Sequence, residues 1–215
     1  MRTRQNGQMP AKQSCSLRAS AMLLSVFLLT LALQHVLQPS LPPETHRISE
    51  YATGSPGWLM TAGFVAWSGA LFSTAAVASR SPLRPRGATH AMSAALLAAA
   101  VGAAATASFK TGTSAGMPLP GHRLTTANHI HDVGSGGLAL ALWGAAFVSL
   151  RLSDRRLRAQ SAWILGCGVL AAVLLSGSVL DVPGLRQRAL VVVACAWQGL
   201  LLSAVRRSWR SLATP

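Results

Sequence analysis

Six long apolar stretches take up most of the chain, and they constrain its fold more than any other feature. Each stretch has about 17–22 residues, the length that an α-helix needs to cross the hydrocarbon core of a bilayer. Backbone polar groups inside lipid must be paired within their own segment, so we expect every stretch to be helical. The six stretches are residues 19–37, 58–79, 91–109, 129–150, 161–180 and 189–205.

The composition indicates that lipid, and not water, surrounds these helices. Of the 215 residues, 51% are hydrophobic and only 11% are charged, whereas about a quarter of a soluble domain is charged. We therefore predict an all-α, polytopic transmembrane bundle over residues 19–205, with basic tails at 1–18 and 206–215. The first stretch lacks a small-x-small cleavage pattern, so we expect it to be retained as a helix.

The basic residues predict the orientation. With the N-terminus inside, fourteen of the nineteen Lys and Arg residues fall in the N-terminal tail, in the segments 80–86 and 151–158, and after residue 205. Lys and Arg are enriched on the cytoplasmic side of membrane proteins. We expect a multi-pass protein of the cytoplasmic membrane with both termini inside. The net charge of +14 sits in short clusters between apolar runs, which does not favour a nucleic-acid partner.

The three cysteines are not expected to pair. Cys15 falls in the predicted inner tail, and Cys167 and Cys195 lie at depths that differ by about 12 Å. A disulfide needs Cα atoms within about 7 Å. We predict neither a disulfide nor a cysteine metal site.

Small residues recur every four positions on the third predicted helix. They are Ala94, Ala98, Gly102 and Thr106. Such a face lets two helices approach closely, so it indicates packing within the bundle.

Most acidic and histidine residues gather on the predicted outer side, in two local patterns. The first is 46–54 (His-Arg-Ile-Ser-Glu-Tyr-Ala-Thr-Gly), where a short interfacial helix, capped by Thr45, would place His46, Ser49 and Glu50 on one face. The second is 125–132, at the start of the fourth helix, where His129 and Asp132 can share a face. His131 points about 200° away from His129 if that helix starts early.

These two patterns resemble those of a known family. The run 46–54, followed by Gly-Trp-Leu-Met at 57–60, is similar to the first motif of the domain-of-unknown-function 998 family, and the threonine-then-His131-Asp132 segment is similar to its second. The resemblance covers about residues 20–205 and implies a six-helix prokaryotic membrane protein with no established activity. Where the family carries a Phe-x-Thr-Asp-like run, this chain has Phe-Lys-Thr-Gly, so Gly112 replaces the acid.

Three functions fit these observations. The first, which we favour, is an accessory, lipid-binding or envelope-associated membrane protein, whose partners are the lipid bilayer and a lipid or a membrane protein. In it, the outer polar residues form a structural network that consists of His46, Ser49, Glu50, Thr126, His129, His131, Asp132 and Asp181.

The second function is a metal-dependent hydrolase at the outer membrane surface. His46, His131 and Asp132 are candidate ligands for a metal such as zinc, which histidine nitrogen and carboxylate oxygen bind. Glu50 would be the general base, with Ser49 or Asp181 in support. The third function is a small-solute transporter. No stretch carries a charge near its middle, where Gln198 is the most polar side chain, so this is disfavoured.

Overall fold

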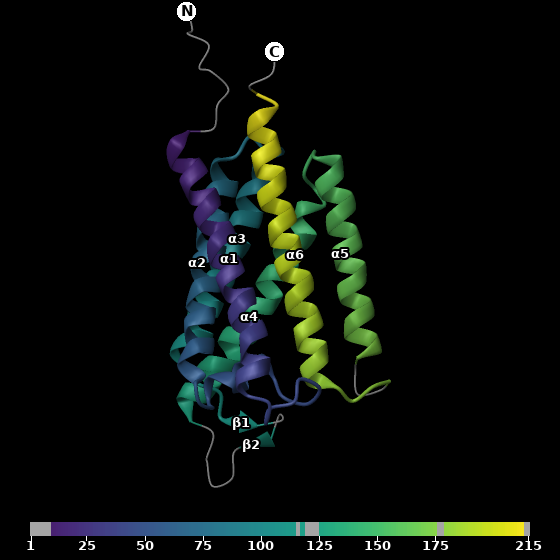
Figure 1. The fold of residues 1–215 in the computed structure, drawn as a ribbon. Helices are drawn as coiled ribbons and strands as arrows, with labels where there is room; N and C mark the ends of the chain where they lie inside the picture. Colours follow the sequence, from purple (N-terminus) through teal and green to yellow (C-terminus); the bar gives the residue numbers. More distant parts are fainter. Residues whose placement is uncertain (1–9, 115–116, 119–124, 176–178, 213–215) are drawn as a thin grey trace, which may run out of the picture.

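The predicted helices are present as a single bundle. The structure is a computed structural model, and it describes residues 10–114, 117–118, 125–175 and 179–212. Within these residues, six helices are long and apolar enough to cross a membrane (Figure 1). They are α1 (Ala11–Leu37), α2 (Gly57–Arg80), α3 (Arg86–Ser108), α4 (Thr126–Ser149), α5 (Arg155–Leu174) and α6 (Pro183–Arg210). The predicted all-α transmembrane bundle is thereby confirmed.

The helix ends differ from the predicted bounds where apolarity alone was the guide. Helix α1 begins at Ala11 and α6 begins at Pro183, because polar residues continue a helix beyond its apolar part and proline is favoured in the first helical turn. Helix α5 ends earlier than expected, at Leu174. The sequence Ser-Gly-Ser that follows at 176–178 contains poor helix formers.

The two ends of the bundle carry different structural elements. Helix α1 begins and α6 ends at the same end, which we call the terminal end (Figure 1). The opposite end, called the loop end, carries a 3-10 helix η1 (Ile48–Ala52) and two paired strands, β1 (Thr113–Ser114) and β2 (Met117–Pro118). The strands are antiparallel and only two residues long, and the apolar pattern does not predict them.

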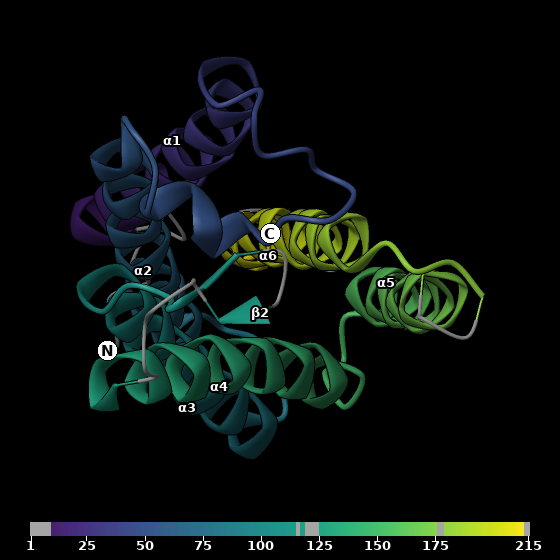
Figure 2. The same ribbon diagram turned by 90° about the horizontal axis from the view of Figure 1, so that it is seen from below.

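The bundle is dense on one side and open on the other. Helix α2 packs against α1 and α3, α3 packs against α4, and α5 packs mainly against α6. Seen from the loop end, α5 lies at the edge of the bundle beside α6 (Figure 2). Only 17% of its apolar window is buried, compared with 56% for α2. Helix α5 is therefore largely available to lipid.

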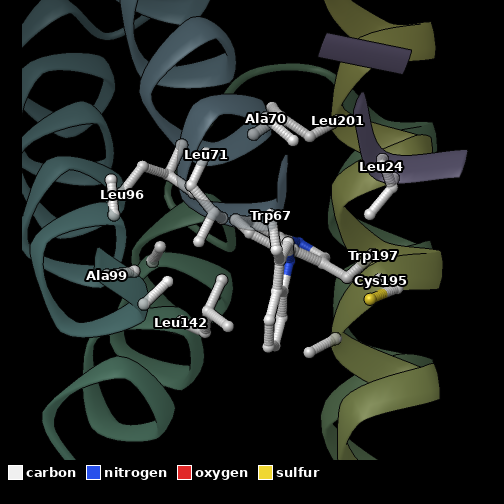
Figure 3. Close-up of a cluster of buried hydrophobic side chains, with 14 of the residues drawn as sticks. Leu24, Trp67, Ala70, Leu71, Leu96, Ala99, Leu142, Cys195, Trp197 and Leu201 are labelled. Atoms are coloured by element: carbon white, nitrogen blue, oxygen red, sulfur yellow. The ribbon is translucent and has the colours of Figure 1, made fainter. Parts of the chain in front are cut away.

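Aromatic and aliphatic side chains form the centre of the bundle. The rings of Phe27 and Trp67 stack with their centroids 4.4 Å apart. Trp67 and Trp197 are both almost fully buried, among leucine and alanine side chains of the neighbouring helices (Figure 3). A stacked aromatic pair contributes beyond its buried area, so this contact helps to fix α1 against α2.

Glycines bring α3 and α4 together. A Cβ atom at Gly102 would lie 2.6 Å from the carbonyl oxygen of Gly134 and 2.8 Å from the nitrogen of Leu138, so only glycine permits this approach. Of the predicted small-residue face, Gly102 and Thr106 are buried, whereas Ala94 and Ala98 are exposed. Only the part of this face that is nearer the loop end therefore packs inside the bundle.

Buried hydrogen bonds join helices in the apolar interior. The Gln198 amide donates to Thr74 Oγ1 (2.9 Å) and accepts from Trp67 Nε1 (3.3 Å), and Ser20 lies 2.6 Å from the same Thr74 oxygen. These contacts tie α1, α2 and α6 together. A buried amide must be hydrogen-bonded, and here it is, so packing alone accounts for the polar side chain in the middle of α6.

Candidate functional site at the loop end

A buried arginine organises the loop end. Arg188, in the second turn of α6, is only 8% exposed. Its Nη1 donates to the carbonyl oxygens of Pro43 (3.0 Å) and His46 (2.6 Å), and also to that of Gly184 in its own helix (3.0 Å). Hydrogen bonds from an ionised donor are the strong ones. Arg188 therefore fastens the segment between α1 and η1 to α6.

The same guanidinium is held by two aromatic rings. Arg188 Nε donates to His35 Nε2 (2.8 Å), while His35 Nδ1 donates to the carbonyl oxygen of Leu31 (2.7 Å). An arginine N–H can only donate, so His35 Nε2 is the acceptor in this contact and Nδ1 is the donor. The guanidinium carbon also lies 5.2 Å from the centre of the Tyr51 ring, a cation–π distance. These contacts join α1, η1 and α6.

Further hydrogen bonds hold η1 in place. Gln187 Oε1 accepts from the backbone N–H of Ile48 (2.7 Å), and Gln38 Nε2 donates to the carbonyl oxygen of Tyr51 (2.9 Å). A side chain at Gly184 would overlap the carbonyl oxygens of Pro43 and His46, so a glycine is needed where the loop crosses α6. The loop end is thus a packed structure and not a loose connection.

The first predicted motif is arranged differently from the expectation. The short helix is a 3-10 helix that begins at Ile48, with Arg47 and not Thr45 in the capping position. His46 therefore lies before the helix, where its ring contacts Thr45 Oγ1 (3.1 Å) and Ser114 Oγ (3.4 Å). Because a 3-10 helix has three residues per turn, its face cannot follow the α-helical spacing assumed from the sequence.

The second motif starts α4 with a capping box. Thr125 Oγ1 accepts from the N–H of Asn128 (3.4 Å), and Asn128 Oδ1 accepts from the N–H of Thr125 (2.8 Å). The helix thus starts early, and its histidines separate. His131 is 2% exposed, and its Nδ1 donates to the carbonyl oxygen of Phe109 (2.6 Å). His129 is exposed and lines a different hollow, between α3 and α4, together with Thr126.

Residues from both motifs line one polar hollow at the loop end, which we call the vestibule. Its volume is about 230 Å³. Arg47 and Ser49 come from the first motif, and His131 and Asp132 come from the second. The remaining lining residues are Ser135 of α4 and Pro183, Arg186, Gln187 and Leu190 of α6. The fold thus brings together charged groups that are more than 80 residues apart in the sequence.

An apolar cavity adjoins the vestibule. Its volume is about 110 Å³, and it shares Ser49, Ser135, Gln187 and Leu190 with the vestibule. The rest of its lining is mostly hydrophobic: Phe27, Ile48, Phe64, Trp67, Thr106, Leu138, Ala139, Leu142, Trp143, Val191 and Ala194. Along α6 this lining reaches from Gln187 to Ala194, a rise of about 10 Å. The cavity therefore lies next to the vestibule and reaches into the membrane-spanning part of the bundle.

The predicted ligand and catalytic residues are only partly brought together. His131 and Asp132 line the vestibule with Ser49, but His46 and Glu50 do not. Glu50 is buried in η1, and Asp181 is exposed before α6. Within the described residues, no three His, Cys, Asp or Glu side chains are grouped as metal ligands would be. Cys15, Cys167 and Cys195 are free thiols.

A family comparison agrees with this architecture. Residues 21–204 match the family described as "Protein of unknown function (DUF998)". The chain belongs to this family. The predicted membership is therefore confirmed, and the protein is a multi-pass membrane protein of a family whose function is not known. Comparisons with curated proteins and with solved structures gave no match.

The structure also explains why an acidic side chain does not fit at position 112. A Cβ atom at Gly112 would lie 2.7–2.8 Å from the amide atoms of Asn128. That amide is engaged, because it donates to the carbonyl oxygen of Lys110 (3.0 Å) and caps α4. Asn128 thus occupies the space that a side chain at 112 would need.

Sequence reasoning missed Arg188, His35 and Gln187. In the sequence, Arg188 is one of the five Lys and Arg residues that lie outside the predicted inner segments, and Gln187 belongs to neither motif. One signal was available: Arg188 directly adjoins the sixth apolar stretch, where a charge must find partners in the protein.

Proposed function

We propose that this protein is a lipid-binding protein that holds one amphiphilic molecule in the vestibule and the cavity. The observation that carries the proposal is that the two hollows are adjacent and share four lining residues, Ser49, Ser135, Gln187 and Leu190. Ligand pockets are mostly apolar, with a few polar groups that orient the ligand. A charged opening above a hydrocarbon-lined interior matches a polar headgroup joined to a hydrocarbon chain.

The size and depth of the cavity support this proposal. An apolar cavity of about 150 Å³ binds a molecule as large as benzene. At about 110 Å³, the cavity has room for a short stretch of one hydrocarbon chain. Its lining spans about 10 Å along α6, roughly a third of a hydrocarbon core of about 30 Å. The vestibule would then lie at headgroup level.

Helix α5 packs behind one part of the cavity wall, the side chain of Trp143. The ring of Trp143, which lines the cavity, lies against Gly168 of α5, where an added Cβ atom would overlap Cη2 of the indole. Because α5 is the least buried helix of the bundle, this wall faces the bilayer.

We further propose that the terminal end is cytoplasmic, in the cytoplasmic membrane, so that the vestibule faces outward. The distribution of Lys and Arg supports this orientation. Single-cysteine variants test it with a membrane-impermeant maleimide on intact cells. A cysteine introduced by Thr53→Cys, at an exposed loop-end position, should be labelled, and the native Cys15 should not be. Labelling of Cys15 alone would reverse the orientation.

The lipid that remains on the protein after purification in a mild detergent tests the binding proposal. We expect about one lipid per protein by native mass spectrometry. The variant Gly168→Leu should lose it, because the new side chain pushes Trp143 from its place beside the cavity. Ala194→Phe should also lose it, since the phenyl ring would fill the cavity from α6.

The matched control is Gly166→Leu. It lies on the same helix, and nothing is within 4 Å of its added Cβ atom, so lipid should be retained. Thermal unfolding in the same detergent shows whether each variant is folded. Equal lipid retention in folded Gly168→Leu, Ala194→Phe and wild-type protein would contradict the proposed function.

A further inference from the structure

The vestibule presents charges of both signs. Arg47 and Arg186 contribute guanidinium groups, and Asp132 contributes a carboxylate. Within the part of the chain that the structure describes, none of the three forms an ion pair with another side chain. Opposite charges that share a hollow without pairing are available to a ligand that carries both signs.

The cationic groups are suited to a phosphate. Arginine is always protonated, and its planar fork matches the oxygen atoms of a phosphate group. Gln187 adds a neutral donor: its Oε1 accepts from the N–H of Ile48 (2.7 Å), which leaves its NH₂ group as the donor end. The set of Arg47, Arg186 and Gln187 can therefore donate several hydrogen bonds to one phosphodiester.

The acceptors are suited to an ammonium group that carries hydrogens. The Asp132 carboxylate only accepts hydrogen bonds. His131 Nδ1 donates to the carbonyl oxygen of Phe109 (2.6 Å), so in the neutral ring Nε2 is an acceptor. These neighbouring residues of α4 give the vestibule a second set of groups, which accept hydrogen bonds.

From these two sets, and resting on the proposed function, we infer that the bound lipid is a zwitterionic phospholipid with a primary ammonium headgroup, as in phosphatidylethanolamine. Its phosphate would contact Arg47 and Arg186, and its ammonium would contact Asp132. Phosphatidylglycerol has no cation, so it would leave the carboxylate unpaired beside its own phosphate. Phosphatidylcholine has no N–H donor and is recognised by aromatic cages. The described lining of the vestibule holds no Trp, Tyr or Phe.

The test is a competition among headgroups. The full-length protein, stripped of lipid by detergent exchange, is given an equimolar mixture of phosphatidylethanolamine, phosphatidylglycerol and phosphatidylcholine with identical chains. Bound lipid is counted by native mass spectrometry. We expect phosphatidylethanolamine to be preferred about tenfold over each of the others, the effect of one charge-assisted hydrogen bond. Asp132→Asn should abolish its preference over phosphatidylglycerol, and Arg186→Gln should lower the retention of all three lipids.

The controls use exposed charges at the same end that do not line the vestibule. Asp181→Asn and Lys110→Gln should retain the wild-type preference. Equal binding of the three lipids by the wild type, or an unchanged preference in Asp132→Asn, would overturn the headgroup assignment and leave the proposed function standing. Binding of none of them would overturn both. Soluble phosphoethanolamine at the same concentration should not displace the lipid, and displacement would show that the ligand is not a membrane lipid.

Discussion

Replacing Arg188 by methionine should release the loop end from the bundle. The change removes two hydrogen bonds to the loop carbonyls of Pro43 and His46 and one to His35, together with the contact over the Tyr51 ring. Each hydrogen bond from a charged donor is worth about 1.5–3 kcal/mol, and such values are not additive. Breaking a buried charged network costs about 3–5 kcal/mol in total.

We take about 3 kcal/mol as the expected loss, because loop carbonyls that are released can be solvated. The loss applies to local opening of residues 38–56 and leaves the helix pairs largely intact. At about 1.4 kcal/mol for each factor of ten, the opening equilibrium should increase about a hundredfold. Amide hydrogen exchange in detergent, read by mass spectrometry on peptides that contain η1, measures this directly.

The matched control is Arg186→Met, and both variants are compared after the bound lipid has been removed by detergent exchange. Arg186 lies on the same end of α6, and no hydrogen bond joins its side chain to residues 38–56 in the described part of the chain. Exchange of η1 should then change less than threefold, since surface substitutions alter stability by about 0.5 kcal/mol or less. If η1 in Arg188→Met is protected as in the wild type, the buried guanidinium does not hold the loop end and the reasoning fails.

Three further changes test the packing. Gly102→Val should lower the free energy of unfolding in detergent by about 1–3 kcal/mol, because its side chain would overlap the backbone of α4. Gly136→Val, with nothing within 4 Å, should lower it much less, and equal effects would contradict the close approach. Gln198→Leu should cost about 0.6–1.7 kcal/mol in the same assay, as interhelical hydrogen bonds in membranes do, and a gain in stability would count against the buried network. Gly112→Asp should displace the Asn128 amide and lower protection of the first turn of α4 by about 1 kcal/mol, measured by hydrogen exchange; unchanged protection would show that the space is not contested.

The helices were predictable because a long apolar segment in lipid has one suitable backbone conformation. An apolar run of about twenty residues must be helical, since no water is present to pair with its backbone. The helix ends were less predictable. Polar residues extend a helix without any change in hydropathy, as α1 does from Ala11 and α6 does from Pro183. The η1 segment was expected as an α-helical turn, but contacts with α6 select a 3-10 helix from Ile48.

The candidate site was predictable in part. The His and acidic residues gather at one end because of the topology. Consecutive helices run in opposite directions, so loops that are 80 residues apart in the sequence can lie at the same end of the bundle. Which of them share a hollow does not follow. His131 and Asp132 line the vestibule, whereas His46 turns to Ser114 and His129 lies in another hollow.

The surrounding solvent, the number of helices and the family follow from the amino-acid sequence, because they depend on the length and apolarity of segments and on local motifs. Only the packing of the elements makes Arg188 a buried anchor and places Arg47 and Arg186 in one hollow with Asp132, where they form no ion pair within the described residues. The physical reason is that the energy of a charge depends on its partners and its burial. Those partners come from α1, η1, α4 and α6, and no local pattern records how these elements meet.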